Sequence, residues 1–166
     1  MKRILIIGSP GSGKSTLAGR ISAKLDIPCV YLDRIFWKPN WIETPKEEFD
    51  RLVQIELEKE SWIIDGNYKR TLSHRLKYAD TVIWLDYPRL ICVWRVWWRH
   101  GKKRPDMTEG CEEKRDKEFF EFLKYIWDFS KEQKETIEKE LSATDAEIII
   151  VHNKKELRNL EKRLGI

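Results

Sequence analysis

Short hydrophobic runs alternate with amphipathic segments along the chain. The runs consist almost entirely of apolar residues and lie at 3–7, 29–32, 62–64, 81–85 and 147–151. Continuous apolar runs of this length are typical of strands that are buried on both faces of a parallel sheet. Between them, apolar residues recur at the three- and four-residue spacing of helices, at 14–25, 45–60, 88–100, 112–141 and 154–164. The alternation predicts an α/β protein in three layers (α/β/α), with helices covering both faces of a parallel sheet.

Capping residues and charge refine three of these helices. Thr44 suits the N-cap of the second helix, and Pro45 suits its first helical position. Asn153 suits the N-cap of the last helix. The second half of the long segment 112–141 is highly charged, so it is either a separate piece or a solvated continuation of the helix.

The composition fits one compact domain over residues 1–166. Basic and acidic residues are nearly balanced, 32 against 28, and the many aromatic residues exclude a disordered chain. No run approaches the roughly 18 apolar residues of a membrane span, and the run after Met1 is too short for the core of a signal peptide. Three cysteines without a CxxC pair favour a reducing compartment. We therefore expect a cytoplasmic protein.

The most specific motif is the phosphate loop Gly8–Ser15, which fits G-x-x-x-x-G-K-[ST] between an expected strand and an expected helix. Its backbone N–H groups and the following helix N-terminus would cradle phosphates. Lys14 would contact the β- and γ-phosphates, and Ser15 would offer its hydroxyl to Mg²⁺. The expected cofactors are therefore ATP and Mg²⁺. The nucleotide-binding residues are assigned to Gly8, Ser9, Pro10, Gly11, Ser12, Gly13, Lys14, Ser15 and Thr16.

Aspartates follow three of the expected strands. Asp33, Asp65 and Asp86 each stand at a carboxyl end, the edge where open parallel sheets bind ligands. Each aspartate also fits a turn former or a helix cap, and Asp86, which precedes Tyr87 and Pro88, fits that role best. Asp33 and Asp65 therefore remain candidates for the site.

The chain resembles the small bacterial P-loop proteins known as adenylate kinase-related or DNA topology modulation (FlaR-type) proteins. The resemblance runs over nearly the whole chain and rests on 8–15, Tyr31-Leu-Asp33, Trp37-Lys-Pro-Asn-Trp41, 62–68 and Trp84-Leu-Asp-Tyr-Pro-Arg89. It implies a nucleoside-monophosphate-kinase-like fold with five parallel strands in the order 2-3-1-4-5. It also implies a substrate-binding segment at about 33–60 and a lid at about 99–112.

The resemblance assigns roles to individual residues. It implies that Asp33 orients the substrate and that Asp65, followed by Gly66, helps Ser15 to hold Mg²⁺. Adenylate kinases continue with Phe-Pro-Arg, whereas this chain has Asn67 and Tyr68, which puts plain AMP recognition in doubt. Two later arginines could substitute, namely Arg70 and Arg75. The loop after the last strand, with Asn153, would pass beside the adenine.

The lid region is strongly basic. It holds Arg89, Arg95, Arg99, Lys102, Lys103 and Arg104, and 89–105 has no acidic residue. Arg95 and Arg99 are four residues apart, so they share one helix face and suit stabilisation of a transferring phosphoryl group. The alternatives are a solvated helix end, which we favour for Lys102 and Lys103, and contacts to nucleic-acid phosphates.

The chain contains eight tryptophans, an unusually high number for its length. Trp37 and Trp41 follow Asp33 in a loop, where they would either wall a pocket for a flat substrate or fill the edge of the core. The expected places of the others are the strands for Trp62 and Trp84, the sheet side of a helix for Trp94 and Trp97, the cleft for Trp98, and the core for Trp127.

Three functions fit these observations. The first is an ATP- and Mg²⁺-dependent kinase whose catalytic residues are Lys14, Asp33, Arg95 and Arg99 and whose acceptor is a nucleotide or another small molecule. The expected acceptor-binding residues are Asp33, Trp37, Trp41, Asp65, Gly66, Asn67 and Tyr68. The second function is a nucleotide-dependent regulatory protein that acts on DNA topology. The third is a P-loop NTPase that works only with a partner protein.

Overall fold

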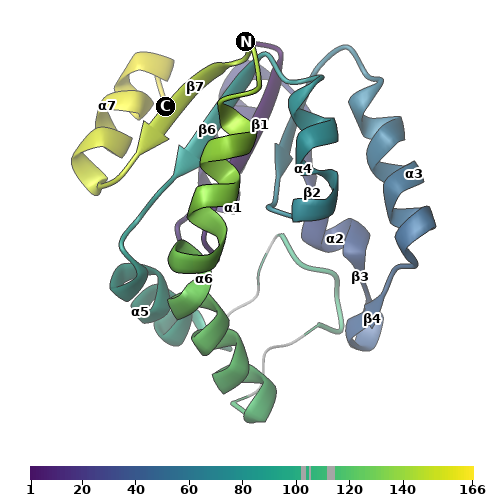
Figure 1. Ribbon diagram of the computed structural model, residues 1–166, viewed down its shortest axis with the longest axis vertical. Helices are drawn as coiled ribbons and strands as arrows, with labels where there is room; N and C mark the ends of the chain where they lie inside the picture. Colours follow the sequence, from purple (N-terminus) through teal and green to yellow (C-terminus); the bar gives the residue numbers. More distant parts are fainter. Residues whose placement is uncertain (102–103, 105, 112–114) are drawn as a thin grey trace.

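A parallel sheet forms the centre of the computed structural model, which describes residues 1–101, 104, 106–111 and 115–166 (Figure 1). Its strands are β1 (Arg3–Gly8), β2 (Cys29–Tyr31), β5 (Trp62–Asp65), β6 (Thr81–Leu85) and β7 (Glu147–Val151). They lie side by side in the order β2-β5-β1-β6-β7, which is 2-3-1-4-5 when these strands alone are counted along the chain. All pairs in this sheet are parallel, with Leu5 of β1 between Ile64 of β5 and Val82 of β6. The predicted fold class and strand order are confirmed.

Helices cover both faces of this sheet. They are α1 (Lys14–Leu25), α2 (Leu32–Phe36), α3 (Lys46–Leu57), α4 (Lys69–Leu76), α5 (Arg89–Arg99), α6 (Lys117–Leu141) and α7 (Lys154–Leu164). A small antiparallel pair, β3 (Trp37–Lys38) and β4 (Ile42–Glu43), encloses the 3-10 turn η1 (Pro39–Trp41). This pair and α2 connect β2 to α3 beside the carboxyl end of the sheet (Figure 1).

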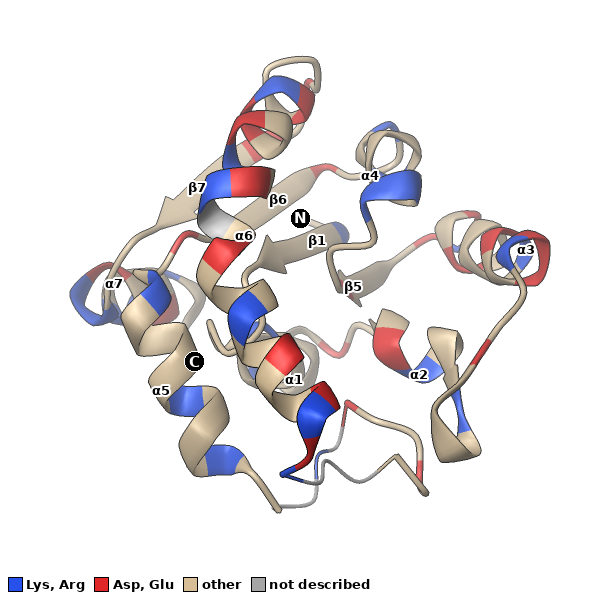
Figure 2. Cartoon of the chain, turned by 60° about the horizontal axis from the view of Figure 1, so that its bottom comes forward, with Lys and Arg blue, Asp and Glu red and all other residues tan. Residues whose placement is uncertain are grey.

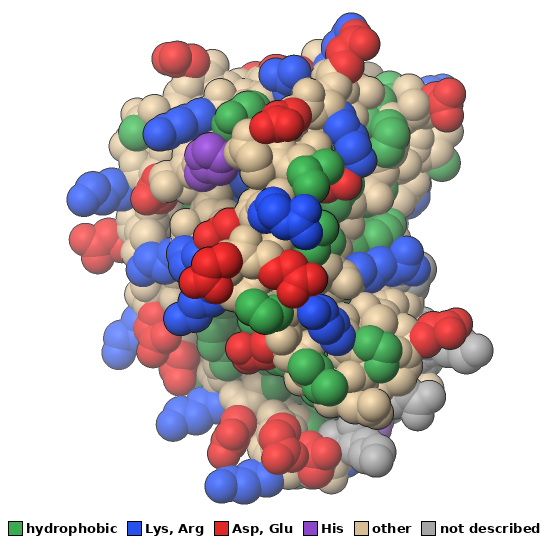
Figure 3. Space-filling view, turned by 90° about the vertical axis from the view of Figure 1, so that its right-hand side faces the viewer, with side chains coloured by type: hydrophobic (Ala, Val, Ile, Leu, Met, Phe, Trp, Pro, Cys, Tyr) green, Lys and Arg blue, Asp and Glu red, His purple; other side chains and the backbone are tan. Residues whose placement is uncertain are grey.

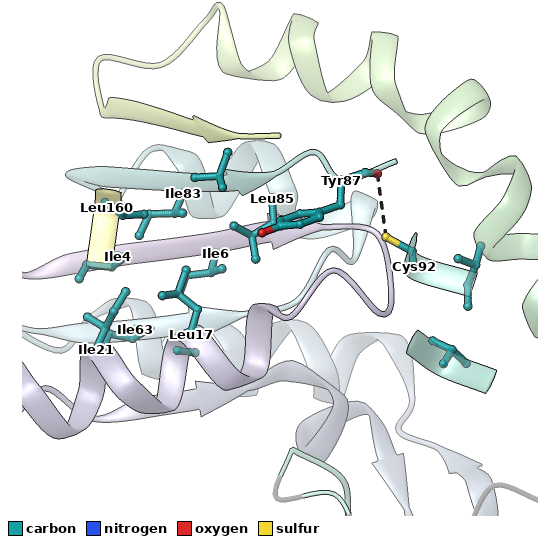
Figure 4. Close-up of a cluster of buried hydrophobic side chains, with 14 of the residues drawn as sticks. Ile4, Ile6, Leu17, Ile21, Ile63, Ile83, Leu85, Tyr87, Cys92 and Leu160 are labelled. Atoms are coloured by element: carbon teal, nitrogen blue, oxygen red, sulfur yellow. Dashed lines mark hydrogen bonds between the residues drawn. The ribbon is translucent and has the colours of Figure 1, made fainter. Parts of the chain in front are cut away.

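Alternate residues of β1 divide the core into two clusters. Ile4 and Ile6 point to the face covered by α1, α5 and α7, and they pack with Leu17 of α1 in one cluster (Figure 4). Leu5 and Ile7 point to the opposite face, where α3 and α4 lie. Helix α6 contributes to both clusters, because its first half packs with the α1 side and its second half with the α3 side. Such burial on both faces explains why the strands are continuous apolar runs.

The structure decides between the two alternatives for the charged second half of the long helix α6. It is a single helix that runs to Leu141, so its charged second half is a solvated continuation rather than a separate piece. One side of that half still carries Ile137 and Leu141 into the core. The side chain of Asp116 caps its start by accepting a hydrogen bond from the amide of Phe119.

The predicted cap at Thr44 is wrong. Pro45 occupies the N-cap position of α3, and Thr44 is buried. The Thr44 hydroxyl donates to the carbonyl of Ile35 at 2.7 Å, which closes the base of the segment containing α2, β3 and β4. The cap predicted at Asn153 is confirmed, because its Oδ1 accepts from the amides of Lys155 and Glu156.

The tryptophans divide differently from the prediction. Trp62 and Trp84 lie in the core as expected, whereas Trp94 is 61% exposed and Trp97 is 37% exposed. Cys92 and Val96 take the sheet-facing positions of α5 instead, so the prediction for Trp94 and Trp97 is wrong. Trp127 is also partly exposed, and the guanidinium of Arg89 covers its ring at 4.1 Å.

Charge is distributed unevenly between the helices. Helix α5 carries basic residues without an acidic one, whereas α3 and α6 carry both signs (Figure 2). On the face at the right of Figure 1, acidic and basic side chains are interspersed (Figure 3). Within the described ranges, none of the helices combines the length and the apolar character needed to cross a bilayer.

Candidate active site

The turn from β1 into α1 has the backbone conformation that the phosphate-loop motif requires. Gly8 and Gly11 have φ angles of 144° and 82°, in the region that side chains disfavour. A Cβ atom at Gly8 would lie 2.4 Å from the carbonyl oxygen of Leu85, and one at Gly11 would lie 2.5 Å from that of Cys92. Gly13, with φ 103°, stands at the N-cap of α1. The loop is thus pressed between β6 and α5, and only glycine fits at its two contact points.

Lys14 and Ser15 begin α1 and face the same space. The Lys14 ammonium group donates to the carbonyl of Ser9 at 3.1 Å, and burial lowers the pKa of Lys14 from its ordinary value. The Ser15 hydroxyl donates to a carboxylate oxygen of Asp106 at 2.9 Å. Asp106 is buried, and Arg104 Nη2 lies 2.6 Å from that same oxygen. The sequence analysis assigned no role to Asp106, although it is the first acidic residue after the basic stretch 89–105.

Asp65 lies at the carboxyl end of β5, buried beside Lys14 and Ser15. Burial raises the pKa of Asp65 to about 6, and the positive charge of Lys14 opposes this rise. Its Oδ1 atom accepts no hydrogen bond from the part of the chain that the structure describes. A buried carboxylate oxygen without a donor, next to a serine hydroxyl, is a suitable oxygen ligand set for Mg²⁺.

The segment after Asp65 is tied to the phosphate loop. The Asn67 side-chain amide accepts from the Gly8 N–H at 2.9 Å and donates to the Gly8 carbonyl at 2.7 Å. The oxygen and the nitrogen of the Asn67 side chain are therefore both bonded to the backbone of Gly8. Gly66, with φ 140°, has no room for a Cβ because Leu32 would lie within 2.8 Å of it.

The two arginines considered as phosphate ligands have other partners. Arg75 is fully buried and donates to the carbonyls of Gly66, Asn67 and Tyr68. Arg70 pairs with Asp50 on the surface. Arg75 therefore stabilises the 66–68 turn from the protein interior. These contacts do not fit the hypothesis that Arg70 or Arg75 replaces an AMP-binding arginine.

Asp33 lies in α2, opposite Tyr68. The Tyr68 hydroxyl donates to Asp33 Oδ1 at 2.8 Å, and Arg104 Nη2 lies 3.7 Å from Asp33 Oδ2. Tyr68 itself has φ 33° at the N-cap of α4. The hydrogen bond between Tyr68 and Asp33 therefore connects the segments that follow β5 and β2, at the carboxyl end of the sheet.

A cavity of about 1290 Å³ brings most of the predicted residues together. Its lining includes Pro10, Gly11, Gly13, Lys14, Ser15, Thr16, Asp33, Trp37, Trp41, Asp65, Gly66, Asn67, Tyr68 and Arg99. Arg104, Asp106 and Met107 line it from the lid side, and Phe122, Tyr125 and Phe129 line it from α6. The sequence analysis did not place these three aromatic residues of α6 at the site.

Several predicted residues lie behind the cavity rather than on its lining. Gly8, Ser9 and Ser12 form the buried or bonded part of the phosphate loop. Arg95 donates to the Ser12 carbonyl at 2.8 Å, and its guanidinium lies 4.7 Å from the centre of the Tyr87 ring. Arg95 thus supports the loop from outside, whereas Arg99, one turn later, faces the cavity.

Two further predictions lie outside the cavity or outside the described residues. Asn153 caps α7 and is exposed, and it does not belong to the described lining. Of the predicted lid at about 99–112, positions 102, 103, 105 and 112 lie outside the described residues, so nothing is assigned to Lys102 or Lys103.

Comparison with solved structures supports the fold. The chain is similar to shikimate kinase from Bacteroides thetaiotaomicron, with a TM-score of 0.63 and 17% sequence identity over 99% of each chain. The chain has a P-loop kinase fold. At this identity the similarity shows the fold alone. Searches of family models and of curated proteins found no match.

Proposed function

We propose that this protein transfers the γ-phosphoryl group of ATP, with Mg²⁺, to a nucleotide or another small-molecule acceptor. The observation that carries the proposal is one shared cavity. It is lined by Lys14 and Ser15 of the phosphate loop, by the strand-end carboxylates Asp33 and Asp65, and by Arg99. Phosphoryl transfer requires a phosphate cradle, an oriented acceptor and positive charge around the transferring group.

The donor side consists of the phosphate loop. The loop amides and the N-terminus of α1 would bind the phosphates of ATP, and the Lys14 ammonium group would neutralise the β- and γ-phosphates. The lowered pKa of Lys14 arises because its charge is buried. A phosphate anion would supply the charge partner that favours protonated Lys14.

Ser15 and Asp65 are the residues that would hold Mg²⁺. The Oδ1 atom of Asp65 has no donor in the described part of the chain, and the Ser15 hydroxyl can give its proton to a carboxylate while its lone pairs stay available. When bound, Mg²⁺ supplies charge neutralisation of the phosphate oxygens.

The acceptor side is formed by Asp33 and the segment after it. Asp33 Oδ1 is fixed by Tyr68, so the carboxylate is held in place to orient an acceptor hydroxyl or to take its proton. Trp37 and Trp41 line the same end of the cavity. We assign Arg99 and Arg104 to the transferring phosphoryl group, and Arg95 to positioning the loop that binds the donor.

Mg·ATP binding and turnover test this proposal directly. ADP release and ³²P transfer are measured over a panel of nucleotides and small hydroxyl compounds, with Lys14→Ala as the test variant. Lys24→Ala, an exposed lysine on the same helix, is the matched control. The proposal expects transfer that Lys14→Ala abolishes and Lys24→Ala retains. Binding of Mg·ATP without any phosphorylated product over the panel contradicts it.

We also propose that the protein works in the cytoplasm and is related to the adenylate kinase-related family. ATP is its expected donor, and Cys29, Cys92 and Cys111 are free thiols, as is usual in a reducing compartment. The resemblance in the motifs around Asp33 and Asp65 supports the family assignment.

A further inference from the structure

We infer that the phosphoryl acceptor is a neutral, ring-bearing alcohol rather than a phosphorylated or carboxylated compound. This inference rests on the proposed kinase function and narrows its substrate class. Three observations carry it: two sets of aromatic rings that line the same cavity, the partners of the arginines near the acceptor end, and the carboxylates that line the cavity.

The first aromatic wall follows directly after Asp33. Phe36 contacts Trp37 with ring centres 4.9 Å apart and Tyr68 with ring centres 5.0 Å apart. Trp37 in turn contacts Trp41 at 5.3 Å. These four side chains line the cavity, and Trp41 remains 40% exposed. These contacts join the four rings into one continuous wall.

The second aromatic wall comes from α6. Phe122 and Tyr125 stack with an interplanar angle of 17°, and Tyr125 contacts Phe129 at 5.9 Å. All three line the same cavity as the first wall. A flat or alicyclic body fits between aromatic walls because it buries apolar area and stacks on ring faces.

An anionic acceptor would need cationic side chains at this end, since phosphate and carboxylate groups are recognised by paired arginines. Among the described residues, three nearby arginines have other partners: Arg70 pairs with Asp50, Arg75 holds buried carbonyls, and Arg34 lies over the ring of Tyr31. Arg99 and Arg104 line the cavity and are assigned above to the transferring phosphoryl group, and the charge of Arg104 is balanced by Asp106 at 2.6 Å and Asp33 at 3.7 Å. Lys69, which is exposed, donates to Thr136 on α6.

Two carboxylates also line the cavity with the tryptophans. Asp33 precedes them in the chain and Glu43 follows them. Negative charge beside a dianionic phosphate costs binding energy, whereas a hydroxyl group can donate its proton to a carboxylate. The charge pattern therefore selects against the acceptors that adenylate kinases and acid kinases use.

The proposed step balances as follows. The acceptor hydroxyl gives its proton to Asp33, and its oxygen forms a bond to the γ-phosphorus of ATP. The bond between that phosphorus and the β,γ-bridging oxygen breaks, and the electron pair leaves with ADP. The products are a phosphate monoester and ADP, so no other reactant is needed.

Matched pairs of compounds test this inference. Thymidine is compared with thymidine monophosphate, and 2-phenylethanol with mandelate, with shikimate as a further hydroxylated ring acid. Dissociation constants are measured by calorimetry with Mg²⁺ and a non-hydrolysable ATP analogue present, and ³²P transfer is measured with ATP. The neutral member of at least one pair should bind about tenfold tighter than its anionic partner, equivalent to about 1.4 kcal/mol. The two pairs distinguish a nucleoside from a simple ring alcohol.

Substitutions in the aromatic wall that follows Asp33 provide a second test of the inference. Trp37→Ala and Trp41→Ala should each weaken binding of the neutral compound about tenfold, and Trp41→Phe should restore most of it. The control is Trp98→Ala, because this exposed tryptophan lies on α5 and not on the described lining. Equal or tighter binding of the anionic partners, or no binding of either neutral compound, overturns the inference. The kinase proposal fails separately, if Mg·ATP is not bound or its turnover does not depend on Lys14.

Discussion

The hydroxyl of Ser15 donates a 2.9 Å hydrogen bond to the carboxylate of Asp106. The two residues are 91 positions apart, and Asp106 belongs to the loop that follows α5. The bond uses the proton of the hydroxyl, which leaves the oxygen lone pairs available. Asp106 thereby adds a second carboxylate to the group formed by Ser15 and Asp65.

Asp106→Asn should raise the Mg²⁺ concentration needed for half-maximal ATP binding by about tenfold, because it removes a negative charge and an acceptor near the metal ligands. Titrations of Mg²⁺ at fixed ATP measure this change. Glu109→Gln, an exposed acidic residue of the same loop, is the matched control. Identical Mg²⁺ curves for Asp106→Asn and the native protein would remove Asp106 from the metal site.

Binding of Mg·ATP should weaken as the pH falls through about 6. Burial raises the pKa of Asp65 to about 6, so its carboxylate loses its charge below that pH and becomes a poor ligand for Mg²⁺. The dissociation constant of Mg·ATP, measured between pH 5 and pH 8, should show this transition. In Asp65→Asn the transition should be absent and the affinity low throughout; a transition that persists in this variant assigns it to another group.

The same carboxyl group should make stability depend on pH. Its folded-state pKa is about 6 against an ordinary value of 3.8, so the native state binds more protons than the unfolded state between these values. The free energy of unfolding should therefore fall as the pH rises from about 4 to about 6, by at most about 3 kcal/mol relative to Asp65→Asn. Urea unfolding of both proteins across this range measures the difference. Parallel pH profiles would contradict a raised pKa at Asp65.

Gly11→Ala should destabilise the protein by about 2 kcal/mol or more and abolish tight ATP binding. The new Cβ would lie 2.5 Å from a backbone oxygen of α5 at a φ of 82°, so the loop must move. Gly101 also has a positive φ, but a Cβ atom there would meet nothing within 4 Å. Gly101→Ala should therefore lower the free energy of unfolding by only about 1 kcal/mol and leave ATP binding intact. Thermal unfolding and ATP affinity distinguish the two. Equal effects would show that strain alone, and not the contact with α5, restricts Gly11.

Arg75→Met should lower the free energy of unfolding by about 3 kcal/mol or more. The substitution leaves buried carbonyls of the 66–68 turn without their donor. Arg70→Met removes an exposed ion pair with Asp50 and an exposed hydrogen bond to the Lys46 carbonyl, and it should change stability by less than about 1 kcal/mol. Denaturant unfolding of the two variants provides the comparison, and similar values for both would refute the structural role of Arg75.

Local motifs allowed much of the fold and the donor side of the site to be predicted. The sequence of Gly8–Ser15 determines its own backbone through glycines and a helix N-terminus, so the loop needed no information from distant residues. The strand-end position of Asp65 was likewise readable from the apolar run before it. The order of the strands came from the family resemblance.

The parts that escaped prediction depend on contacts between distant residues. Asp106 bonds to Ser15 from 91 positions further along the chain, and no local pattern indicates that contact. Arg75 sits in a short helix whose apolar pattern is weak, and its burial follows from carbonyls that the 66–68 turn directs inward. Trp94 has the spacing of a buried residue, yet the smaller Cys92 and Val96 occupy the sheet-facing positions.

The double hydrogen bond between Asn67 and Gly8 has a consequence for the two substrates of the proposed kinase. It joins the start of the phosphate loop, where the donor would bind, to the 66–68 turn, where the acceptor would bind, and these two segments follow the adjacent strands β1 and β5. The separation between the two substrates is then built in before either arrives. Under the proposed function, a catalytic cycle would therefore leave the distance between the phosphate loop and the 66–68 turn unchanged.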